Sequence, residues 1–440
     1  MYVCISCALS EEIAMADEKV MMGREPLIEH EKTKSIKQIL LKSIAGVLLV
    51  GFACYLFLDS FTSLTPETEI NSLPLEKAVN EQHPKKEVCD VSTGEWIPNP
   101  SGPIYTNATC NHIQNHQNCM KNGRPDTGYL YWRWKPSNCD LPPFDPVKFL
   151  NKMRDKSWVF IGDSIFRNHF QSLTCMLSKV EELVETYHDS AYRCQTLFSP
   201  NYNFTLAVIW APYLVQYESI DSETLNIHLD ILDSKWSSEY NKYDYVVISG
   251  GQWFYRSAIM YENNKAVGCH NCPYENLREL GVVEPYRKAL QLTLNFMARA
   301  EHKPFVIFRT WTPDHFEYGK WYNGGICNRT EPFKEGEING YPVDLVMRNT
   351  EVEEFGKAAA IGERNGVRME LLDTYHLSLL RPDGHPGPYR TYHPFDGDKK
   401  KKVQNDCLHW CLPGPIDTWN ELLMKMVING DDHDSISALS

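Results

Sequence analysis

The stretch "WVFIGDSIFRNHFQ", residues 158–171, decides the fold. Its apolar run Trp158–Ile161 ends abruptly in Gly-Asp-Ser, and the residues that follow have the pattern of a helix. A strand that passes the chain directly to a helix is the building unit of α/β proteins. Ser164 at this junction is either a helix N-cap or a nucleophile placed where helix amides can hold a developing negative charge. The three residues alone do not distinguish these two roles.

Alternation of short apolar runs and amphipathic segments continues along the chain. Strands are predicted at 158–161, 204–210, 245–248, 305–308 and 369–372, and helices at 165–185, 284–300 and 350–364. This alternation predicts a parallel sheet covered by helices on both faces. Functional residues of such sheets collect beyond the carboxyl ends of the strands, where Ser164, Gly250-Gly251 and Arg309-Thr310 lie.

Composition excludes some partners. The chain has 440 residues, 42% of them hydrophobic, which is enough for one large domain or two small ones with a sizeable core. The formal net charge of −13 and the lack of a long basic face argue against nucleic acid as a partner. The lysine run 399–402 lies in a Gly/Asp-containing loop and is interpreted as a solvated loop.

A membrane anchor is predicted near the N-terminus. Residues 39–58 are apolar apart from Lys42 and Ser43, which is about the length that spans a bilayer. Lysines precede this segment and Asp59 follows it, so the positive-inside rule predicts a single-pass type II protein rather than a cleaved signal peptide. The predicted organisation is a cytoplasmic tail (1–38), a transmembrane signal anchor (39–58), a luminal stem (59–87), a catalytic domain (88–430) and a C-terminal tail (431–440).

Cysteines and glycosylation sequons fit a translocated domain. Eleven of the fourteen cysteines follow the anchor, a density that indicates disulfides in an oxidising compartment. A zinc site at the "CHNC" stretch 269–272, or at Cys407, His409 and Cys411, is the less favoured alternative. Sequons place possible glycans at Asn107, Asn203 and Asn328.

A nucleophilic serine needs a base and a carboxylate that orients it. The best candidates are Asp406 and His409 in "NDCLHWCLPGPIDTWNELL", residues 405–423, because their spacing allows the carboxylate to contact the imidazole within one turn. The alternative is that Asp406 is an N-cap and His409 a buried, satisfied histidine. His315 in "WTPDHF" and His385 in "DGHPG" are rival bases in Pro/Gly loops.

These motifs carry a family resemblance. "VFIGDSIFRNHFQSL" and "DCLHWCLPGPIDTWN", with "CDVSTGEW", "FRTWTPDHFEYGKWYNGGIC" and "RPDGHPG", make the chain from about Cys89 to Ile428 resemble the plant trichome-birefringence-like family of polysaccharide O-acetyltransferases. The resemblance implies a Golgi enzyme of type II topology. Its catalytic domain would consist of a disulfide-tied, loop-rich N-terminal segment followed in the sequence by an SGNH-hydrolase-like α/β core. It also implies a triad of Ser164, His409 and Asp406. "SGGQWF" at Ser249 departs from the family pattern, and the backbone amides of Ser164 and Gly251 are the expected oxyanion donors.

The resemblance further implies four disulfides. They are Cys89–Cys139, Cys110–Cys175, Cys119–Cys411 and Cys327–Cys407. For the remaining cysteines, either Cys269 pairs with Cys272 or Cys194 pairs with one of them.

The resemblance implies acetyl transfer to a plant cell-wall polysaccharide as the function. Xyloglucan is the favoured acceptor, with xylan, mannan and pectin as alternatives. The acetyl donor is unidentified; an acetyl-CoA-derived species is one candidate, and membrane proteins that supply the donor are candidate partners. No bound cofactor and no metal are expected. Aromatic side chains near the sheet edge are candidate sugar platforms, and the predicted substrate-binding set is Trp132, Trp134, Trp253, Arg309, His315 and Trp321, with Tyr129, Tyr131 and Trp311 as further aromatic candidates. An acetylesterase with the same triad and a non-catalytic polysaccharide-binding protein are the competing functions.

Overall fold

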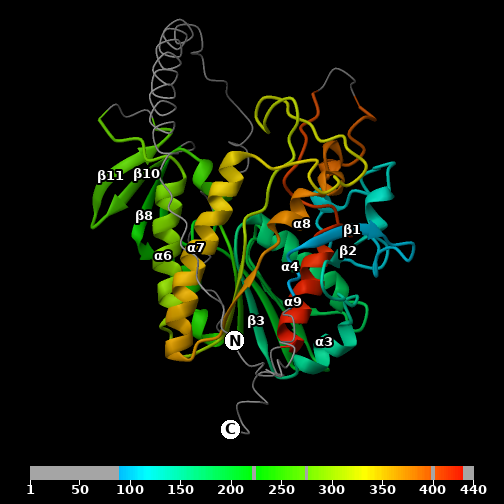
Figure 1. Ribbon diagram of the computed structural model, residues 1–440, viewed down its shortest axis with the longest axis horizontal. Coiled ribbons are helices and arrows are strands. Elements are labelled where there is room, and N and C mark those ends of the chain that lie inside the picture. Colours follow the sequence, from blue (N-terminus) through cyan, green and yellow to red (C-terminus); the bar gives the residue numbers. More distant parts are fainter. Residues whose placement is uncertain (1–88, 221–223, 273–275, 398–401, 430–440) are drawn as a thin grey trace, which may run out of the picture. The chain divides into compact units, whose positions relative to one another are not determined.

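The computed structural model describes residues 89–429 except 221–223, 273–275 and 398–401 (Figure 1). The expected cytoplasmic tail, anchor, stem and C-terminal tail lie outside these residues, as does the lysine run 399–402 except for Lys402. Within the described ranges, no helix combines the length and the apolar character that crossing a membrane requires.

A seven-stranded sheet forms the centre of the described domain. Its order is β13-β12-β9-β3-β6-β5-β4. The strands are β3 (Ser157–Gly162), β4 (Val184–His188), β5 (Gln195–Ser199), β6 (Phe204–Trp210), β9 (Tyr245–Ile248), β12 (Phe305–Arg309) and β13 (Met369–Leu372). The five strands predicted from apolar runs are the five that pair in parallel, from β13 to β6, whereas β5 and β4 add an antiparallel edge.

Helices cover both faces of this sheet, as Figure 1 shows for α6 and α7 on one side and α4 and α9 on the other. The helices are α3 (Pro146–Lys152), α4 (Ser164–Leu177), α5 (Ser234–Ser237), α6 (Val283–Ala298), α7 (Pro342–Asn365), α8 (Tyr375–Leu379) and α9 (Asp417–Asn429). Two hydrophobic clusters result. One packs β-strand side chains such as Val246 against α6, and the other packs Phe160 against the apolar side chains of α4 and α9.

Two predicted helices have different bounds in the structure. The helix predicted at 165–185 ends at Leu177, and residues 184–188 form β4 instead. The antiparallel partner β5 supplies backbone hydrogen bonds that a local helical pattern cannot anticipate. The helix predicted at 350–364 begins at Pro342, because proline is favoured in the first helical turn, where its missing N–H costs nothing.

Smaller sheets and turns flank the core. A four-stranded sheet has the order β11-β10-β8-β7, and a two-stranded sheet pairs β1 with β2. These strands are β1 (Gly94–Pro98), β2 (Trp132–Pro136), β7 (Val215–Ser219), β8 (Leu225–Leu232), β10 (Ala258–Glu262) and β11 (Lys265–His270). Short 3₁₀ helices are η2 (Asn115–Gln117), η3 (Gly128–Leu130), η4 (Tyr240–Lys242), η5 (Gln252–Tyr255), η6 (Pro382–Gly384) and η7 (Pro388–Arg390).

Disulfides tie the cysteine-rich segment, residues 89–143, to the α/β core. The structure contains the four pairs expected in the sequence analysis, Cys89–Cys139, Cys110–Cys175, Cys119–Cys411 and Cys327–Cys407. Cys269 is bonded to Cys272. The sulfurs of both zinc alternatives are thus engaged in disulfides. Cys194 is buried, and its sulfur accepts a hydrogen bond from the Trp210 amide.

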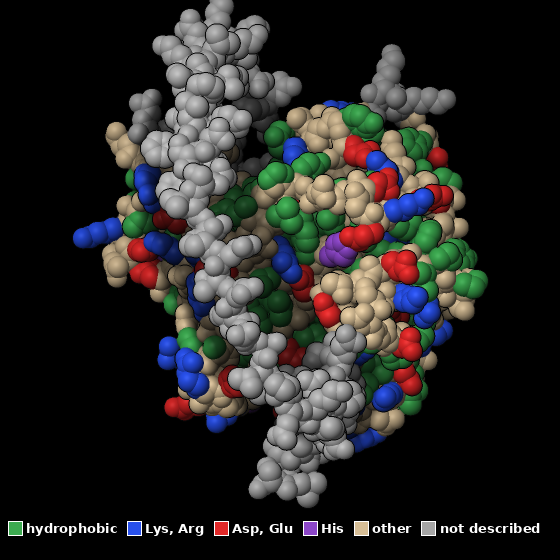
Figure 2. All heavy atoms as spheres, in the orientation of Figure 1, with side chains coloured by type: hydrophobic (Ala, Val, Ile, Leu, Met, Phe, Trp, Pro, Cys, Tyr) green, Lys and Arg blue, Asp and Glu red, His purple; other side chains and the backbone are tan. Residues whose placement is uncertain are grey.

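The molecular surface agrees with the acidic composition. On the face drawn in Figure 2, Lys and Arg side chains are interspersed with Asp and Glu and do not form a continuous basic area. Among the predicted sequons, Asn203 and Asn328 are exposed and Asn107 is half-buried.

Candidate active site

Ser164 is the first residue of α4, directly after the carboxyl end of β3. The N-cap role belongs to its neighbour: the Asp163 carboxylate accepts a hydrogen bond from the Ile165 amide at 3.0 Å. The half-buried Ser164 hydroxyl is therefore not needed as the cap. This arrangement decides against the first of the two roles considered for Ser164.

Gly162 brings the end of β3 close to the end of β9. A Cβ atom at Gly162 would lie 2.6 Å from the Ser249 carbonyl oxygen, so only glycine allows this approach. The Ser249 amide donates to the Ile161 carbonyl at 3.2 Å. The Ser249–Gly251 turn thus lies beside the strand end that carries Ser164.

Asp406 and His409 form a direct pair. His409 Nδ1 lies 2.8 Å from Asp406 Oδ2, while Asp406 Oδ1 accepts the backbone amides of His409 at 3.0 Å and Leu408 at 3.2 Å. Burial by itself would raise the pKa of Asp406, but the charge and hydrogen bonds of His409, with Arg390 nearby, hold it well below its usual range. Asp406 is therefore a carboxylate that orients the ring.

The other ring nitrogen of His409 is the chemically interesting one. Nε2 is buried and has no hydrogen-bond partner among the described residues. An imidazole whose Nδ1 is held by a carboxylate and whose Nε2 carries a lone pair can accept a proton at Nε2. The predicted alternative, a histidine satisfied on both nitrogens, does not fit this geometry.

Asn168 links the loop of His409 to helix α4. Its side-chain oxygen accepts the Trp410 amide at 2.7 Å, and its amide nitrogen donates to the Trp410 carbonyl at 3.3 Å. Ser164 and Asn168 are separated by one helical turn and so share a face of α4. Asn168 thereby holds the residue after His409 on the same face as the serine.

Electrostatics agree that His409 lies near the start of α4. Burial raises the pKa of Asp163, whereas the positive charge of Arg309, and that of His409 when it holds a proton, act in the opposite direction. A proton on His409 would therefore lower the pKa of Asp163, the residue that precedes Ser164.

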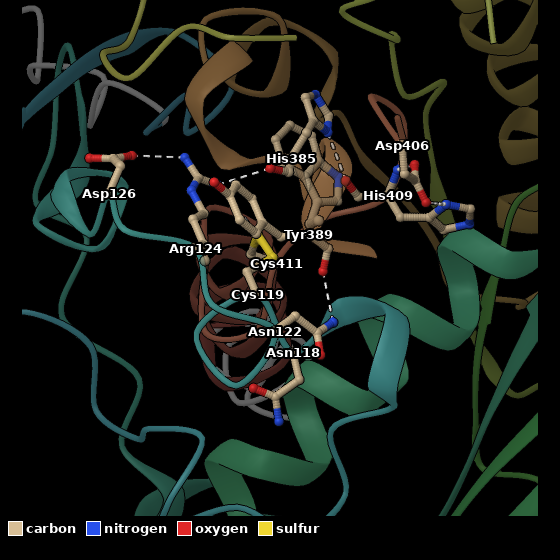
Figure 3. The surroundings of a disulfide bond; sticks show 12 residues. Asn118, Cys119, Asn122, Arg124, Asp126, His385, Tyr389, Asp406, His409 and Cys411 are labelled. Carbon is tan, nitrogen blue, oxygen red and sulfur yellow. Dashed lines mark hydrogen bonds and ion pairs between the residues drawn. A yellow bond between two sulfur atoms is a disulfide. The ribbon is translucent and has the colours of Figure 1, made fainter. Parts of the chain in front are cut away.

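The cysteine-rich segment supports the loop that carries Asp406 and His409 (Figure 3). Cys119 is bonded to Cys411, two residues after His409, and Arg124 donates to the carbonyls of Asp383 at 2.7 Å and His385 at 2.9 Å. Arg124 also pairs with Asp126 at 2.8 Å. The loop is thus held by covalent and polar contacts to the N-terminal part of the domain.

The rival histidines have structural partners. His385 Nδ1 lies 2.7 Å from the His409 carbonyl oxygen, and its Nε2 lies 2.7 Å from His315 Nδ1. His315 Nε2 lies 2.9 Å from the Leu379 carbonyl oxygen. Because both rings are buried and engaged at both nitrogens, they support the backbone of His409 rather than offering a free base to Ser164.

His116 is a neighbour of the base that sequence reasoning missed. Its ring meets the His409 ring edge to face, with centroids 6.2 Å apart. Burial, with the charge of His409, lowers the pKa of His116 to about 3, so it is neutral at physiological pH. No sequence signal marks His116, whereas Asn168, four residues after Ser164 in the opening stretch, had one in its helical spacing.

Arg309 is an internal scaffold residue. It is 2% exposed and donates to Ser249 Oγ at 3.0 Å and to the Thr310 carbonyl at 2.8 Å. Burial lowers its pKa to about 10, which leaves it positively charged at neutral pH. The Arg309 guanidinium binds the Ser249 turn, and its predicted role in holding substrate stays a prediction.

The aromatic candidates divide by burial. Trp134 is 1% exposed and donates to the Val91 carbonyl, so it belongs to the core, as do the buried Trp311, Tyr129 and the imidazole of His315. These side chains cannot stack on a sugar. Trp132 and Trp253 are half-buried, and Trp321 and Tyr131 are exposed at 40% and 46%. The exposed and half-buried rings stay candidates for the acceptor platform.

Comparison with known proteins shows which proteins this chain resembles. Residues 141–426 match the profile of the PC-Esterase family, described as a GDSL/SGNH-like acyl-esterase family found in Pmr5 and Cas1p, and residues 87–140 match the PMR5 N terminal domain. Protein trichome birefringence-like 26 of Arabidopsis thaliana is 52% identical over 87% of this chain and 85% of its own length.

Two relatives carry names that state an activity. Xyloglucan O-acetyltransferase 1 of Arabidopsis thaliana is 40% identical, covering 88% of this chain and 90% of its own. Xyloglucan O-acetyltransferase 2 of Populus trichocarpa is 42% identical, covering 77% and 82%. Among solved structures, a putative GDSL-like lipase from Parabacteroides merdae matches 62% of this chain and 95% of its own with 13% identity and a TM-score of 0.29.

Proposed function

The chain belongs to the PC-esterase family of GDSL/SGNH-like acyl-esterases, in its trichome-birefringence-like branch, and from this premise we propose that it is a polysaccharide O-acetyltransferase. Xyloglucan is the favoured acceptor, because two relatives of 40% and 42% identity are named for its acetylation. The observation that carries the proposal is His409, with Nδ1 on Asp406, Nε2 unpartnered, and its loop held on the Ser164 face of α4.

The proposed reaction is a double displacement. Ser164 Oγ attacks the acyl carbon of the donor while His409 Nε2 takes the hydroxyl proton, and Asp406 holds the resulting imidazolium. Collapse of the tetrahedral intermediate breaks the bond to the donor's leaving group, which receives the proton. A sugar hydroxyl then attacks the acetyl-serine, gives its proton to His409 and leaves with the acetyl group, and Ser164 regains its proton.

Negative charge on the acyl oxygen needs donors in both steps. The backbone amide of Ser164 lies at the N-terminus of α4, where amide groups without helical partners point outward. We assign the second donor to the amide of Gly251, in the turn that Gly162 brings beside Ser164. Each such donor contributes about 3–4 kcal/mol to stabilisation of the transition state.

We also propose that the enzyme is a Golgi type II membrane protein, anchored by residues 39–58, with the catalytic domain in the lumen. The five disulfides of the described domain support an oxidising compartment. Protease digestion of sealed vesicles should spare the C-terminal domain. Digestion of that domain in intact vesicles would overturn the topology.

Acyl transfer is tested with the purified luminal domain, p-nitrophenyl acetate as acyl donor and a panel of deacetylated glycans. Donor alone should add one acetyl mass to the peptide that contains Ser164, and xyloglucan should remove it and become acetylated. Ser164→Ala should abolish labelling, whereas Ser178→Ala, at the other end of α4, should not. Acetyl release only to water would favour the esterase, and full activity of Ser164→Ala would exclude both enzymes.

A further inference from the structure

A carboxyl group outside the triad is buried beside the Gly250–Gly251 turn. Glu351 of α7 has 0% exposure, and its Oε1 lies 2.6 Å from the hydroxyl of Tyr286 on α6. Its Oε2 accepts the backbone amide of Trp311. The Tyr286 hydroxyl also lies 3.0 Å from the Gly250 carbonyl oxygen. Neither Glu351 nor Tyr286 has a role in the triad.

The number of hydrogens available to Glu351, Tyr286 and Gly250 determines whether Glu351 is protonated. A phenol has one hydrogen to donate, whereas a backbone carbonyl and an ionised carboxylate can only accept. Tyr286 therefore cannot bond both Gly250 and an ionised Glu351 at once. Both bonds exist together when Glu351 is a carboxylic acid, so that Glu351 donates to Tyr286 and Tyr286 donates to the Gly250 carbonyl.

The Gly250 carbonyl and the Gly251 N–H belong to one peptide group. The two bonds of a planar trans peptide point in opposite directions, so a partner that holds the carbonyl also aims the amide. Gly251 has φ +113°, and a Cβ there would lie 2.9 Å from the rings of Trp311 and Tyr286. The Gly251 backbone is therefore held by van der Waals contact with these two rings as well as by the hydrogen bond between Tyr286 and the Gly250 carbonyl.

We propose that Glu351, as a neutral acid, is a positioning residue that acts through Tyr286 to keep the Gly251 N–H directed at the acyl oxygen on Ser164. This inference rests on the proposed function, in which the Gly251 amide is the second oxyanion donor. Glu351 does not touch the reacting atoms. It sets the direction of a donor whose alignment decides how well charge is stabilised.

The surroundings of Glu351 agree with a neutral acid. Burial raises the pKa of Glu351 to about 8, against the lowering effect of its hydrogen bonds to Tyr286 and Trp311 and of the charge on Arg309; Asp373 raises it further. Burial also raises the pKa of Tyr286 far above its usual value, with the Glu351 charge adding to the effect and the charges of Arg309 and Asp163 as smaller influences. The phenol keeps its proton throughout.

A pH dependence follows with a definite sign. Glu351 is neutral below its raised pKa, and the chain of donors is then complete. As pH rises through about 8, Glu351 ionises, becomes an acceptor and draws the only Tyr286 hydrogen away from Gly250. We therefore expect the rate of Ser164 acylation to fall on the alkaline side.

Substitutions distinguish whether Glu351 acts as a neutral hydrogen-bond donor or as a negatively charged carboxylate. Glu351→Gln keeps one donor and one acceptor at every pH, so it should retain the acylation rate with p-nitrophenyl acetate and lack the alkaline fall. Glu351→Ala and Tyr286→Phe remove the donor to the turn, and we expect acylation about 10–100-fold slower with little change in KM. Glu354→Gln is the matched control, because Glu354 is 3% exposed on the same helix but pairs with Arg287 and Lys357 instead. It should keep the wild-type pH profile.

Infrared difference spectroscopy gives a readout that does not depend on turnover. Burial raises the pKa of Glu351 and also that of Glu421 to about 8, so the wild type and Glu354→Gln should lose the carbonyl stretch of two protonated carboxylic acids above this pH. Glu351→Gln should lack the Glu351 component and keep only that of Glu421. Glu351→Gln that is folded but as slow as Glu351→Ala would overturn the proposal, as would a Tyr286→Phe variant with wild-type acylation. If the wild-type protein never acylates Ser164, the proposed function is refuted instead. If Ser164 is acylated but no glycan receives the acetyl group, only the proposed acceptor is refuted.

Discussion

Replacing Asn168 by leucine removes both hydrogen bonds that hold Trp410, and with it His409, on helix α4. The Trp410 amide loses a partner at 2.7 Å and its carbonyl one at 3.3 Å, in a site where Asn168 is fully buried. A buried backbone group left without a partner costs about 1–3 kcal/mol. Because the second bond is long, we expect Asn168→Leu to lower the free energy of unfolding by about 2–4 kcal/mol.

The same change should slow catalysis. A displacement of about 1 Å between reacting groups costs about 100-fold in rate, and the leucine frees the residue next to His409 to move by that order. Urea unfolding measures the stability, and burst kinetics with p-nitrophenyl acetate measure acylation of Ser164 in the fraction that remains folded.

Thr174→Val is the matched control for this helix. Thr174 is buried and donates to the Phe170 carbonyl one turn back, without contact to the His409 loop. Its loss should cost about 1 kcal/mol and leave acylation unchanged. Equal acylation rates in Asn168→Leu and Thr174→Val would refute the role assigned to Asn168.

Three further outcomes are expected. Trp321 is 40% exposed, so Trp321→Ala should raise the KM for acceptor glycan several-fold without changing stability. Trp134 is 1% exposed, so Trp134→Ala should lower the free energy of unfolding by about 3–5 kcal/mol. Acceptor titrations measure the first effect and thermal melts the second. The lowered pKa of Asp406 stabilises the fold above the unfolded value of about 4, and this contribution is lost as pH falls, so Asp406→Asn should flatten the acid side of a melting-temperature profile. Serine at both Cys119 and Cys411 should cost about 2–5 kcal/mol and reduce acylation, and unchanged acylation would show that this bond does not position the loop.

Local patterns predicted much of this fold. The five parallel strands appear where short apolar runs predicted them, because strands buried on both faces need continuous apolar sequence. The pairing of Asp406 with His409 was also local, since three residues of spacing suffice for contact. By contrast, β4 was predicted as helix, because its partner strand, not its own pattern, decides its conformation.

The sequence by itself determined which residues could do chemistry. These are Ser164, directly after β3, and the pair of Asp406 and His409 near the C-terminus. Only the tertiary structure decided which polar groups meet, since Glu351, Tyr286 and Gly250 come from α7, α6 and the turn after β9. It also decided which tryptophans face solvent, because Trp134 and Trp321 look alike in sequence and differ in burial. Periodicity reports on neighbours along the chain, whereas burial and the proton on Glu351 depend on what distant segments place around a side chain.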